Sequence, residues 1–219
     1  MNFPIARTVS ITAALLIGAV SAQAQKNTPP PIVERVIESL RQGRTHYTAM
    51  SGILPLREAI AALHGCAPEN VFVGNGSDEI LALCIRAFVE RDGSVGYFDP
   101  SYSLYPILTD IEDVEKRPVA LDAAFGWQMP ADYSASLFFL TNPNAPTSLK
   151  FSTANVESFA TSFAGVVLVD EAYADFSDEH CMELALAHEN VLVARTLSKS
   201  YSLAGIRLGY CVGNADLIG

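Results

Sequence analysis

The sequence predicts an α/β fold, with βαβ units arranged around a mostly parallel sheet. Helical periods alternate with short apolar runs along the chain: helices at 31–42, 54–64 and 155–163, and strands near 95–98, 137–140 and 166–169. Alternation of this kind is typical of βαβ units. Half of the 219 residues are hydrophobic and 17% are charged, which favours a packed core over disorder.

A lysine follows the apolar strand predicted at 191–194. Lys199 lies eight residues before Arg207, with Thr196 and Ser198 on its N-terminal side. A lysine where a buried strand meets a loop can form a Schiff base with a carbonyl, and the hydroxyls and the arginine could bind a nearby phosphate. Pyridoxal phosphate requires these groups. The alternative is a surface turn rich in serine and lysine.

A continuous apolar run at 165–169 ends abruptly on Asp170 and Glu171. Such a run indicates a parallel strand buried on both faces, with its acids at the carboxyl end, where open α/β sheets bind ligands. An aspartate there can keep a pyridine nitrogen protonated, so that the ring acts as an electron sink. Tyr173 could reach the phenolic oxygen of the same ring. Alternatively, Asp170 caps the strand and Tyr173 is ordinary packing.

A short strand from Val71 leads through a glycine-bearing turn into a helix predicted from Ser77 to about Glu90. Helix N-termini offer free N–H groups, so the backbone amides of Gly76, Ser77 and Asp78 could hold a phosphate. The segment is not a Walker loop, because no Gly-Lys-Ser/Thr follows, and its glycines do not fit the dinucleotide fingerprint. An ordinary helix cap with acids in the first turn is the alternative.

The strand at 137–140 breaks into a loop whose two prolines fix its path. An asparagine amide at this break could donate to the phenolate oxygen of the cofactor. Prolines and asparagines also simply make turns, so the loop alone leaves both interpretations open.

Together these segments resemble the fold-type I aminotransferases, which use pyridoxal phosphate. From about Pro68 to Leu217 the chain is similar to histidinol-phosphate aminotransferase, through PENVFVGNGSDE, PSYSLY, TNPNAPTS, VDEAYADF and RTLSKSYSLAGIRLGY. Residues 28–62 are more similar to the bacterial aspartate and aromatic aminotransferases. The resemblance implies a three-layer αβα large domain with a mostly parallel sheet.

The resemblance also implies roles for individual residues. Lys199 would form the imine with the cofactor and shuttle the proton, Asp170 would pair with the pyridine nitrogen, and Tyr173 would bond the phenolic oxygen. Tyr102 would stack on the ring. The cofactor phosphate would be held by Gly76, Ser77, Asp78, Thr196, Ser198 and Arg207. Tyr47 resembles the tyrosine that reaches across a dimer interface to the neighbouring phosphate, which implies a homodimer.

The chain departs from the family pattern in the loop after residue 140. Ala145 stands where the family usually has an asparagine, and we expect Asn144 to take its place in binding the cofactor. Ser148 replaces the glycine of the usual Pro-Thr-Gly, and serine tolerates a positive φ less readily than glycine.

The resemblance implies a further C-terminal stretch, which normally folds into a small domain and supplies the arginine that grips the substrate carboxylate. We therefore expect residues 25–219 to be an incomplete cofactor-binding large domain. Residues 1–24 carry Arg7, an apolar stretch at 11–20 and the small residues Ala22 and Ala24, the pattern of a secretory signal peptide. The alternative is an apolar N-terminal helix or a misassigned start. A signal predicts a periplasmic or secreted protein and the resemblance a cytoplasmic one, so the location stays open.

The net charge of −10 argues against nucleic acid or an anionic membrane surface as partner, and no stable membrane span is expected after signal removal. The four histidines are scattered, which does not predict a metal site. The four cysteines form no Cys-x-x-Cys pair and lie in mostly apolar segments, which favours buried free thiols.

The expected reaction is transfer of an amino group from an L-amino acid or histidinol phosphate to a 2-oxo acid such as 2-oxoglutarate. A lyase or decarboxylase on the same fold is one alternative, because the cofactor stabilises a carbanion whichever bond breaks. A non-catalytic remnant is the other.

Overall fold

The computed structural model describes residues 30–43 and 53–219. The predicted signal peptide at 1–24 and Tyr47 lie outside these residues. The chain divides into two compact units. Helix α2 (Pro30–Arg41) belongs to the first and is amphipathic, with Val33, Val36 and Leu40 exposed. The sheet and the cavity described below belong to the second. In the described part of the chain, no helix is long and apolar enough to cross a membrane.

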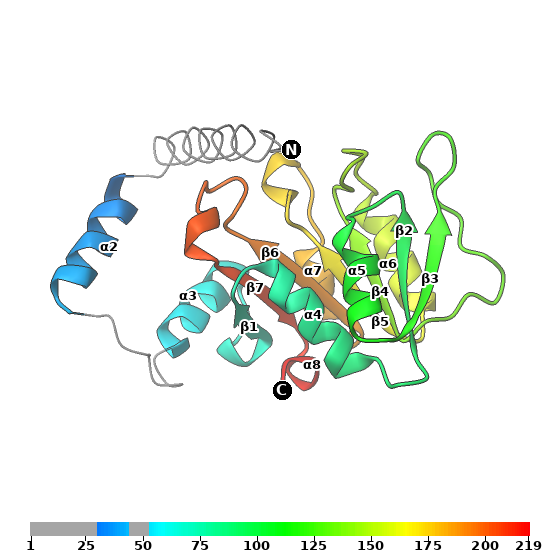
Figure 1. Cartoon of the computed structure of the whole chain (residues 1–219), viewed down its shortest axis with the longest axis horizontal. Coiled ribbons are helices and arrows are strands. Elements are labelled where there is room, and N and C mark those ends of the chain that lie inside the picture. Colours follow the sequence, from blue (N-terminus) through cyan, green and yellow to red (C-terminus); the bar gives the residue numbers. More distant parts are fainter. Residues whose placement is uncertain (1–29, 44–52) are drawn as a thin grey trace, which may run out of the picture. The chain divides into compact units, whose positions relative to one another are not determined.

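Seven strands of the second unit form one sheet (Figure 1). They are β1 (Val71–Gly74), β2 (Ser94–Asp99), β3 (Glu115–Ala120), β4 (Leu137–Thr141), β5 (Val166–Asp170), β6 (Val191–Thr196) and β7 (Gly209–Gly213). Their order is β1-β7-β6-β5-β4-β2-β3. β7 runs antiparallel to both its neighbours, β1 and β6, and the other neighbouring strands are parallel to each other. The prediction of a mostly parallel sheet is confirmed.

Helices cover both faces of the sheet. Apolar residues of α3 (Leu54–His64), α6 (Thr153–Ser162) and α7 (Met182–Ala187) join one core cluster. Those of α4 (Ser77–Phe88) and α5 (Leu104–Ile111) join a second cluster on the opposite face, where the short α8 (Ala215–Ile218) also packs. Figure 1 shows α4 and α5 in front of the strands. The three-layer αβα architecture expected from the family resemblance is therefore confirmed.

The central strands are apolar on both faces. Every residue of β4 is buried, with Phe138 and Leu140 in one cluster and Leu137 and Phe139 in the other. This explains why the strand appears in the sequence as an unbroken apolar run instead of an alternating one. The predicted helix from Ser77 ends at Phe88, slightly before the expected end, because the next residue is extended.

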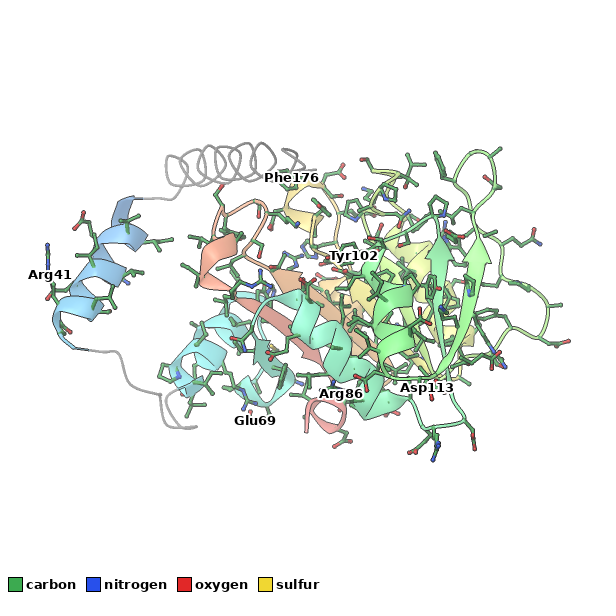
Figure 2. All side chains as sticks on the ribbon, in the orientation of Figure 1. Arg41, Glu69, Arg86, Tyr102, Asp113 and Phe176 are labelled. Carbon is green, nitrogen blue, oxygen red and sulfur yellow. The ribbon has the colours of Figure 1, made fainter. Side chains whose placement is uncertain are left out.

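The parallel strands bring their carboxyl ends to one edge of the sheet. Asp99, Thr141, Asp170 and Thr196 are the last residues of β2, β4, β5 and β6. Figure 2 shows Tyr102, just beyond β2, at this end of the strands, and Arg86 and Asp113 at the opposite end. Among the described residues, this unit also contains the short 3₁₀ turns η2 (Pro68–Asn70), η3 (Ala174–Phe176) and η4 (Ala204–Ile206).

Candidate active site

A cavity of about 170 Å³ opens at the carboxyl edge of the sheet. It is lined by Lys199, Asp170 and Tyr173, the three residues with expected catalytic roles. The cavity is also lined by most residues expected to stack on the cofactor ring or hold its phosphate, namely Ser77, Asp78, Tyr102, Thr196, Ser198 and Arg207. The structure therefore brings together side chains from five separate segments of the chain.

Asp170 ends β5 with its carboxylate buried beside the cavity. Only 2% of the residue is exposed. Its Oδ2 accepts a hydrogen bond from Tyr105 Oη at 2.8 Å, and its Oδ1 accepts one from the Ala172 amide at 3.2 Å. Burial raises the pKa of the Asp170 carboxyl to about 6, although these two hydrogen bonds oppose the rise. The carboxylate is thus fixed in orientation and is costly to ionise without a cation.

Tyr105 was not predicted from the sequence as a site residue. It is fully buried on α5, it stacks against Phe139, and burial raises the pKa of its phenol well above the ordinary value. Its hydroxyl also hydrogen-bonds Thr141, another cavity-lining residue. Tyr105 therefore joins the ends of β4 and β5 through their side chains.

Asn144 does not face the cavity. Its Oδ1 accepts from Ser101 Oγ at 2.9 Å, its Nδ2 donates to a backbone carbonyl at 3.0 Å, and the residue is 1% exposed. Ala145 lines the cavity in its place. The geometry therefore does not support the expectation that Asn144 contacts the cofactor, because its hydrogen-bonding groups are used by Ser101 and Pro100, in the segment after β2, and by Thr147.

Ser148 adopts the left-handed backbone conformation, with φ at 59°. In the left-handed conformation a Cβ atom lies too close to the following carbonyl oxygen, and glycine, which has no Cβ, does not make this contact. The glycine that is usual here in the resembled family fits this conformation, and Ser148 adopts it at some cost in backbone strain.

The start of α4 forms one wall of the cavity. Asp78 Oδ1 accepts a hydrogen bond from Tyr102 Oη at 3.2 Å, and its Oδ2 lies 3.6 Å from Arg207 Nη2. Burial, together with the nearby Asp78 carboxylate, raises the pKa of Tyr102 to about 12. Gly76 does not line the cavity but lies directly under the arginine, where a Cβ would come 2.7 Å from Arg207 Nη2. The helix N-terminus and the guanidinium thus face the same space.

Gly209 allows this wall to form. A Cβ on Gly209 would lie 2.4 Å from both the Gly76 carbonyl carbon and the Ser77 nitrogen. Backbone atoms of β7 and α4 can approach this closely only when the strand residue has no side chain. The sequence signal for this approach is a glycine two residues after Arg207.

Lys199 follows β6 in a loop. Its Nζ lies 5.5 Å from the centre of the Tyr173 ring. Ser198, which directly precedes Lys199, forms two hydrogen bonds with Thr196 at the end of β6. The Ser198 amide donates to Thr196 Oγ1 at 3.2 Å, and Thr196 Oγ1 donates to Ser198 Oγ at 3.0 Å. These bonds turn the chain so that the lysine projects toward the tyrosine.

The cavity combines a primary amine, a buried carboxylate and an anion-binding wall. A ligand with a carbonyl, a protonatable ring nitrogen and a phosphate would meet a suitable partner for each group. Pyridoxal phosphate has all three. Within residues 30–43 and 53–219, no group of three or more histidine, cysteine or acidic residues is placed to hold a metal ion.

The fold and the cavity define a cofactor-binding α/β domain, and comparison with known proteins gives its family. The chain belongs to the aminotransferase class I and II family, whose sequence model matches residues 13–219. This match begins within the segment expected to be a signal peptide.

Two relatives are histidinol-phosphate aminotransferases. The chain is 43% identical to that of Geobacter sulfurreducens over 194 residues, covering 86% of this chain and 55% of the relative. It is 40% identical to that of Chromohalobacter salexigens over 194 residues, covering 87% of this chain and 55% of the relative. The chain thus spans about half the length of these relatives.

Solved structures share the fold. Histidinol-phosphate aminotransferase from Sinorhizobium meliloti in complex with pyridoxal-5'-phosphate superposes with a TM-score of 0.76 at 24% identity, covering 88% of this chain and 55% of that one. A double mutant of Thermus thermophilus aspartate aminotransferase gives a TM-score of 0.79 at 21% identity, covering 99% and 66%.

Proposed function

We propose that this chain provides the cofactor site of a pyridoxal-phosphate-dependent aminotransferase. The proposed reaction moves an amino group from histidinol phosphate or an L-amino acid to a 2-oxo acid such as 2-oxoglutarate. The observation that carries the proposal is that Lys199 and Asp170, at the ends of adjacent parallel strands, line one cavity with an anion-binding wall. Membership of the aminotransferase family supports the same reaction class.

Lys199 and Asp170 would divide the chemistry between them. When bound, pyridoxal phosphate supplies an electron sink for the bond that breaks next to the substrate nitrogen. The Lys199 amine would hold the cofactor through the carbonyl carbon of the cofactor and then yield that position to the substrate amine. Lys199 would afterwards carry a proton between the substrate carbon that bears the nitrogen and the former carbonyl carbon of the cofactor. Asp170 would accept a hydrogen bond from the protonated ring nitrogen, and Tyr105, which donates to Asp170 Oδ2, would keep the carboxylate aimed.

The remaining cavity residues would hold the cofactor in place. Arg207 and the amides at the start of α4 would bind the phosphate, assisted by the Thr196 and Ser198 hydroxyls. Tyr102 would stack on the ring, and Tyr173 would hydrogen-bond its phenolic oxygen. We leave Asn144 out of this set, because its side-chain polar atoms are hydrogen-bonded to Ser101 and to the Pro100 carbonyl.

Histidinol phosphate is the amino donor we favour. Relatives named histidinol-phosphate aminotransferase are 37–43% identical to this chain. The solved structures with a similar fold include an aspartate aminotransferase and a protein with a methionine aminotransferase function, but at 21% and 24% identity they support the fold alone.

Two parts of the proposal concern N-terminal residues outside those that the structure describes. We propose a homodimer in which Tyr47 reaches the phosphate of the partner subunit, supported by the resemblance of its segment to aspartate aminotransferases. We also propose that residues 1–24 are a signal peptide, supported by their charge and hydrophobicity pattern. Light scattering tests the first, and N-terminal sequencing of the mature protein tests the second.

Borohydride trapping tests the cofactor site. Incubation with pyridoxal phosphate, reduction and peptide mapping should place the adduct on Lys199, and Lys199→Ala should remove it. Lys150→Ala is the matched control, because Lys150 forms surface ion pairs with Asp178 and Glu179 outside the cavity. An adduct that persists in Lys199→Ala would refute the assignment.

Turnover is measured separately, with 2-oxoglutarate as acceptor. Histidinol phosphate, aspartate and an aromatic amino acid are compared as donors, and we expect the highest kcat/KM with histidinol phosphate. A higher value for aspartate would refute the choice of donor but not the cofactor site.

A further inference from the structure

A buried ion pair lies directly behind the cavity-lining residues. Glu171 follows Asp170, and Arg195 precedes Thr196. Glu171 Oε2 accepts a hydrogen bond from Arg195 Nε at 2.9 Å and lies 2.8 Å from Arg195 Nη2 in an ion pair. The side chain of Glu171 is 1% exposed and that of Arg195 is 13% exposed. The pair therefore ties the end of β5 to the end of β6 in a site largely shielded from water.

The same arginine reaches the segment that carries the lysine. Arg195 Nη1 lies 3.5 Å from Asp175 Oδ1, and Asp175 Oδ2 accepts a hydrogen bond from Ser200 Oγ at 2.5 Å. Ser200 directly follows Lys199 in the chain. Tyr173 lies between Glu171 and Asp175. One continuous network thus connects the segment holding Asp170 and Tyr173 to the segment holding Lys199.

Stability alone is a poor explanation for such a network. Two charges removed from water cost several kcal/mol each in desolvation, which their attraction only partly offsets, so a buried pair contributes little net stability. Its clearer effect is geometric, because a planar guanidinium held to one carboxylate oxygen by a hydrogen bond and an ion-pair contact restricts the distance and angle between the strands that it joins.

Lys199 is the residue that most needs such a restraint. It is exposed and lies in a loop, and a lysine side chain has four rotatable bonds. Its backbone must be held if its amine is to meet a carbonyl in a productive orientation. The hydrogen bond from Ser200 to Asp175 holds the backbone next to Lys199. Arg195 contacts both Asp175 and Glu171, and so connects this part of the backbone to the segment that carries Asp170.

We infer that the network Glu171–Arg195–Asp175–Ser200 positions Lys199 relative to Asp170 and Tyr173, with Arg195 as its central positioning residue. This inference rests on the proposed function, since it concerns how Lys199 meets the cofactor carbonyl. It predicts that weakening the network slows bond formation at Lys199 without weakening the docking of the cofactor ring and phosphate.

The test uses the two exposed members of the network. Removing Arg195 would leave Glu171 buried without its charge partner and could unfold the protein. Asp175→Ala and Ser200→Ala, alone and together, break the connection at its outer end. Ser200→Thr retains the hydroxyl. Asp178→Ala is the matched control, because this exposed carboxylate forms an ion pair with Lys150 outside the network.

Three measurements are made on the 219-residue chain. The first is the rate at which pyridoxal phosphate becomes attached to Lys199, followed by absorbance and by borohydride trapping. The second is the Kd of pyridoxine phosphate, which lacks the aldehyde and so reports docking alone. The third is the midpoint of urea unfolding without ligand.

We expect Asp175→Ala and Ser200→Ala each to slow attachment about three- to tenfold, as for the loss of one ordinary, solvent-exposed hydrogen bond. The double variant should be no slower than the slower single variant, because both changes break the same connection. Ser200→Thr should recover most of the rate, and Asp178→Ala should match the parent. The Kd for pyridoxine phosphate and the unfolding midpoints should stay unchanged throughout.

Attachment at the parental rate in Asp175→Ala and Ser200→Ala would overturn the inference while leaving the proposed function intact. A parallel loss of pyridoxine phosphate binding or of stability would also overturn it, because the network would then support the fold in general. If the parent itself forms no adduct at Lys199, the proposed function fails and the inference fails with it.

Discussion

Replacing Asp170 with asparagine is expected to stabilise the protein without cofactor at pH 8. Burial raises the pKa of this carboxyl from its ordinary 3.8 to about 6, against the effect of the hydrogen bonds from Tyr105 and the Ala172 amide. A carboxyl with a higher pKa in the folded state holds its proton more tightly when folded. Stability is therefore lost as the pH rises from about 4 through about 6, and the loss persists at higher pH.

The magnitude follows from the two pKa values. A rise from 3.8 to about 6 corresponds to a penalty of about 3 kcal/mol at pH 8. Asparagine has a similar shape and no charge, but its single oxygen cannot easily accept both hydrogen bonds, and one lost bond costs about 1 kcal/mol. The expected net gain in the free energy of unfolding is about 2 kcal/mol at pH 8, and it should vanish near pH ~4.5.

Urea unfolding at several pH values measures this gain. Trp127 is the single tryptophan of the chain and packs against Phe98, Phe151 and Phe159 in the core, so its fluorescence reports unfolding. Asp178→Asn is the control, because a hydrogen bond from Lys150 lowers the pKa of this exposed carboxyl. An Asp170→Asn protein less stable than its parent at pH 8, or a difference independent of pH between 5 and 8, would refute the reasoning.

Three further changes test other features of the structure. Gly209→Ala should destabilise the protein by about 2 kcal/mol, measured by urea unfolding, and weaken binding of inorganic phosphate, measured by calorimetry, because the new methyl group meets backbone atoms at the start of α4. Gly205→Ala is the control and should change neither the stability nor the phosphate binding, because nothing lies within 4 Å of the added Cβ. Ser148→Gly should raise the unfolding free energy by up to about 1 kcal/mol, since it removes a side chain from a positive φ, and a lower value in urea would contradict this. Cys66 should be the first thiol to react with a disulfide reagent, because the other three are buried, and Cys66→Ser should abolish the fast phase of the absorbance change.

The central strands and their polar ends could be predicted from the sequence. The run from Leu137 to Leu140 is apolar throughout because both its faces are covered, and it ends on Thr141, as neighbouring runs of the same kind end on Asp170 and Thr196. In a parallel sheet such ends must lie at one edge, so the proximity of Asp170 to Lys199 follows from chain order and strand direction.

The edge strand β3 and the antiparallel strand β7 could not be recognised from a continuous apolar run. β3 (Glu115–Ala120) is mostly exposed and its sequence EKRPVA has no apolar run. β7 (Gly209–Gly213) has only three residues between its glycines. A signal for its direction did exist, because a parallel connection requires a crossover and the segment between β6 and β7 contains only the three-residue turn η4.

Within the candidate site, the sequence predicted side-chain chemistry better than side-chain direction. Asn144 and Ala145 are adjacent, and only the path of the loop decides that the alanine lines the cavity. Tyr102 and Tyr105 are three residues apart, and the start of α5 between them turns one toward Asp78 and the other toward Asp170. Such choices depend on backbone geometry, which no residue type specifies alone.

The antiparallel pairing of β7 has a consequence for how this site can change. Thr196 at the end of β6 pairs with Gly209 at the start of β7, so residues 197–208 leave the sheet and return to it at the same point. Lys199 and Arg207 both lie in this excursion. Lengthening a flexible loop costs only about 0.6 kcal/mol per doubling. The spacing between the Lys199 amine and the Arg207 guanidinium can therefore be changed by insertion or deletion within residues 197–208 while every strand keeps its register, so this segment can be redesigned without redesigning the sheet.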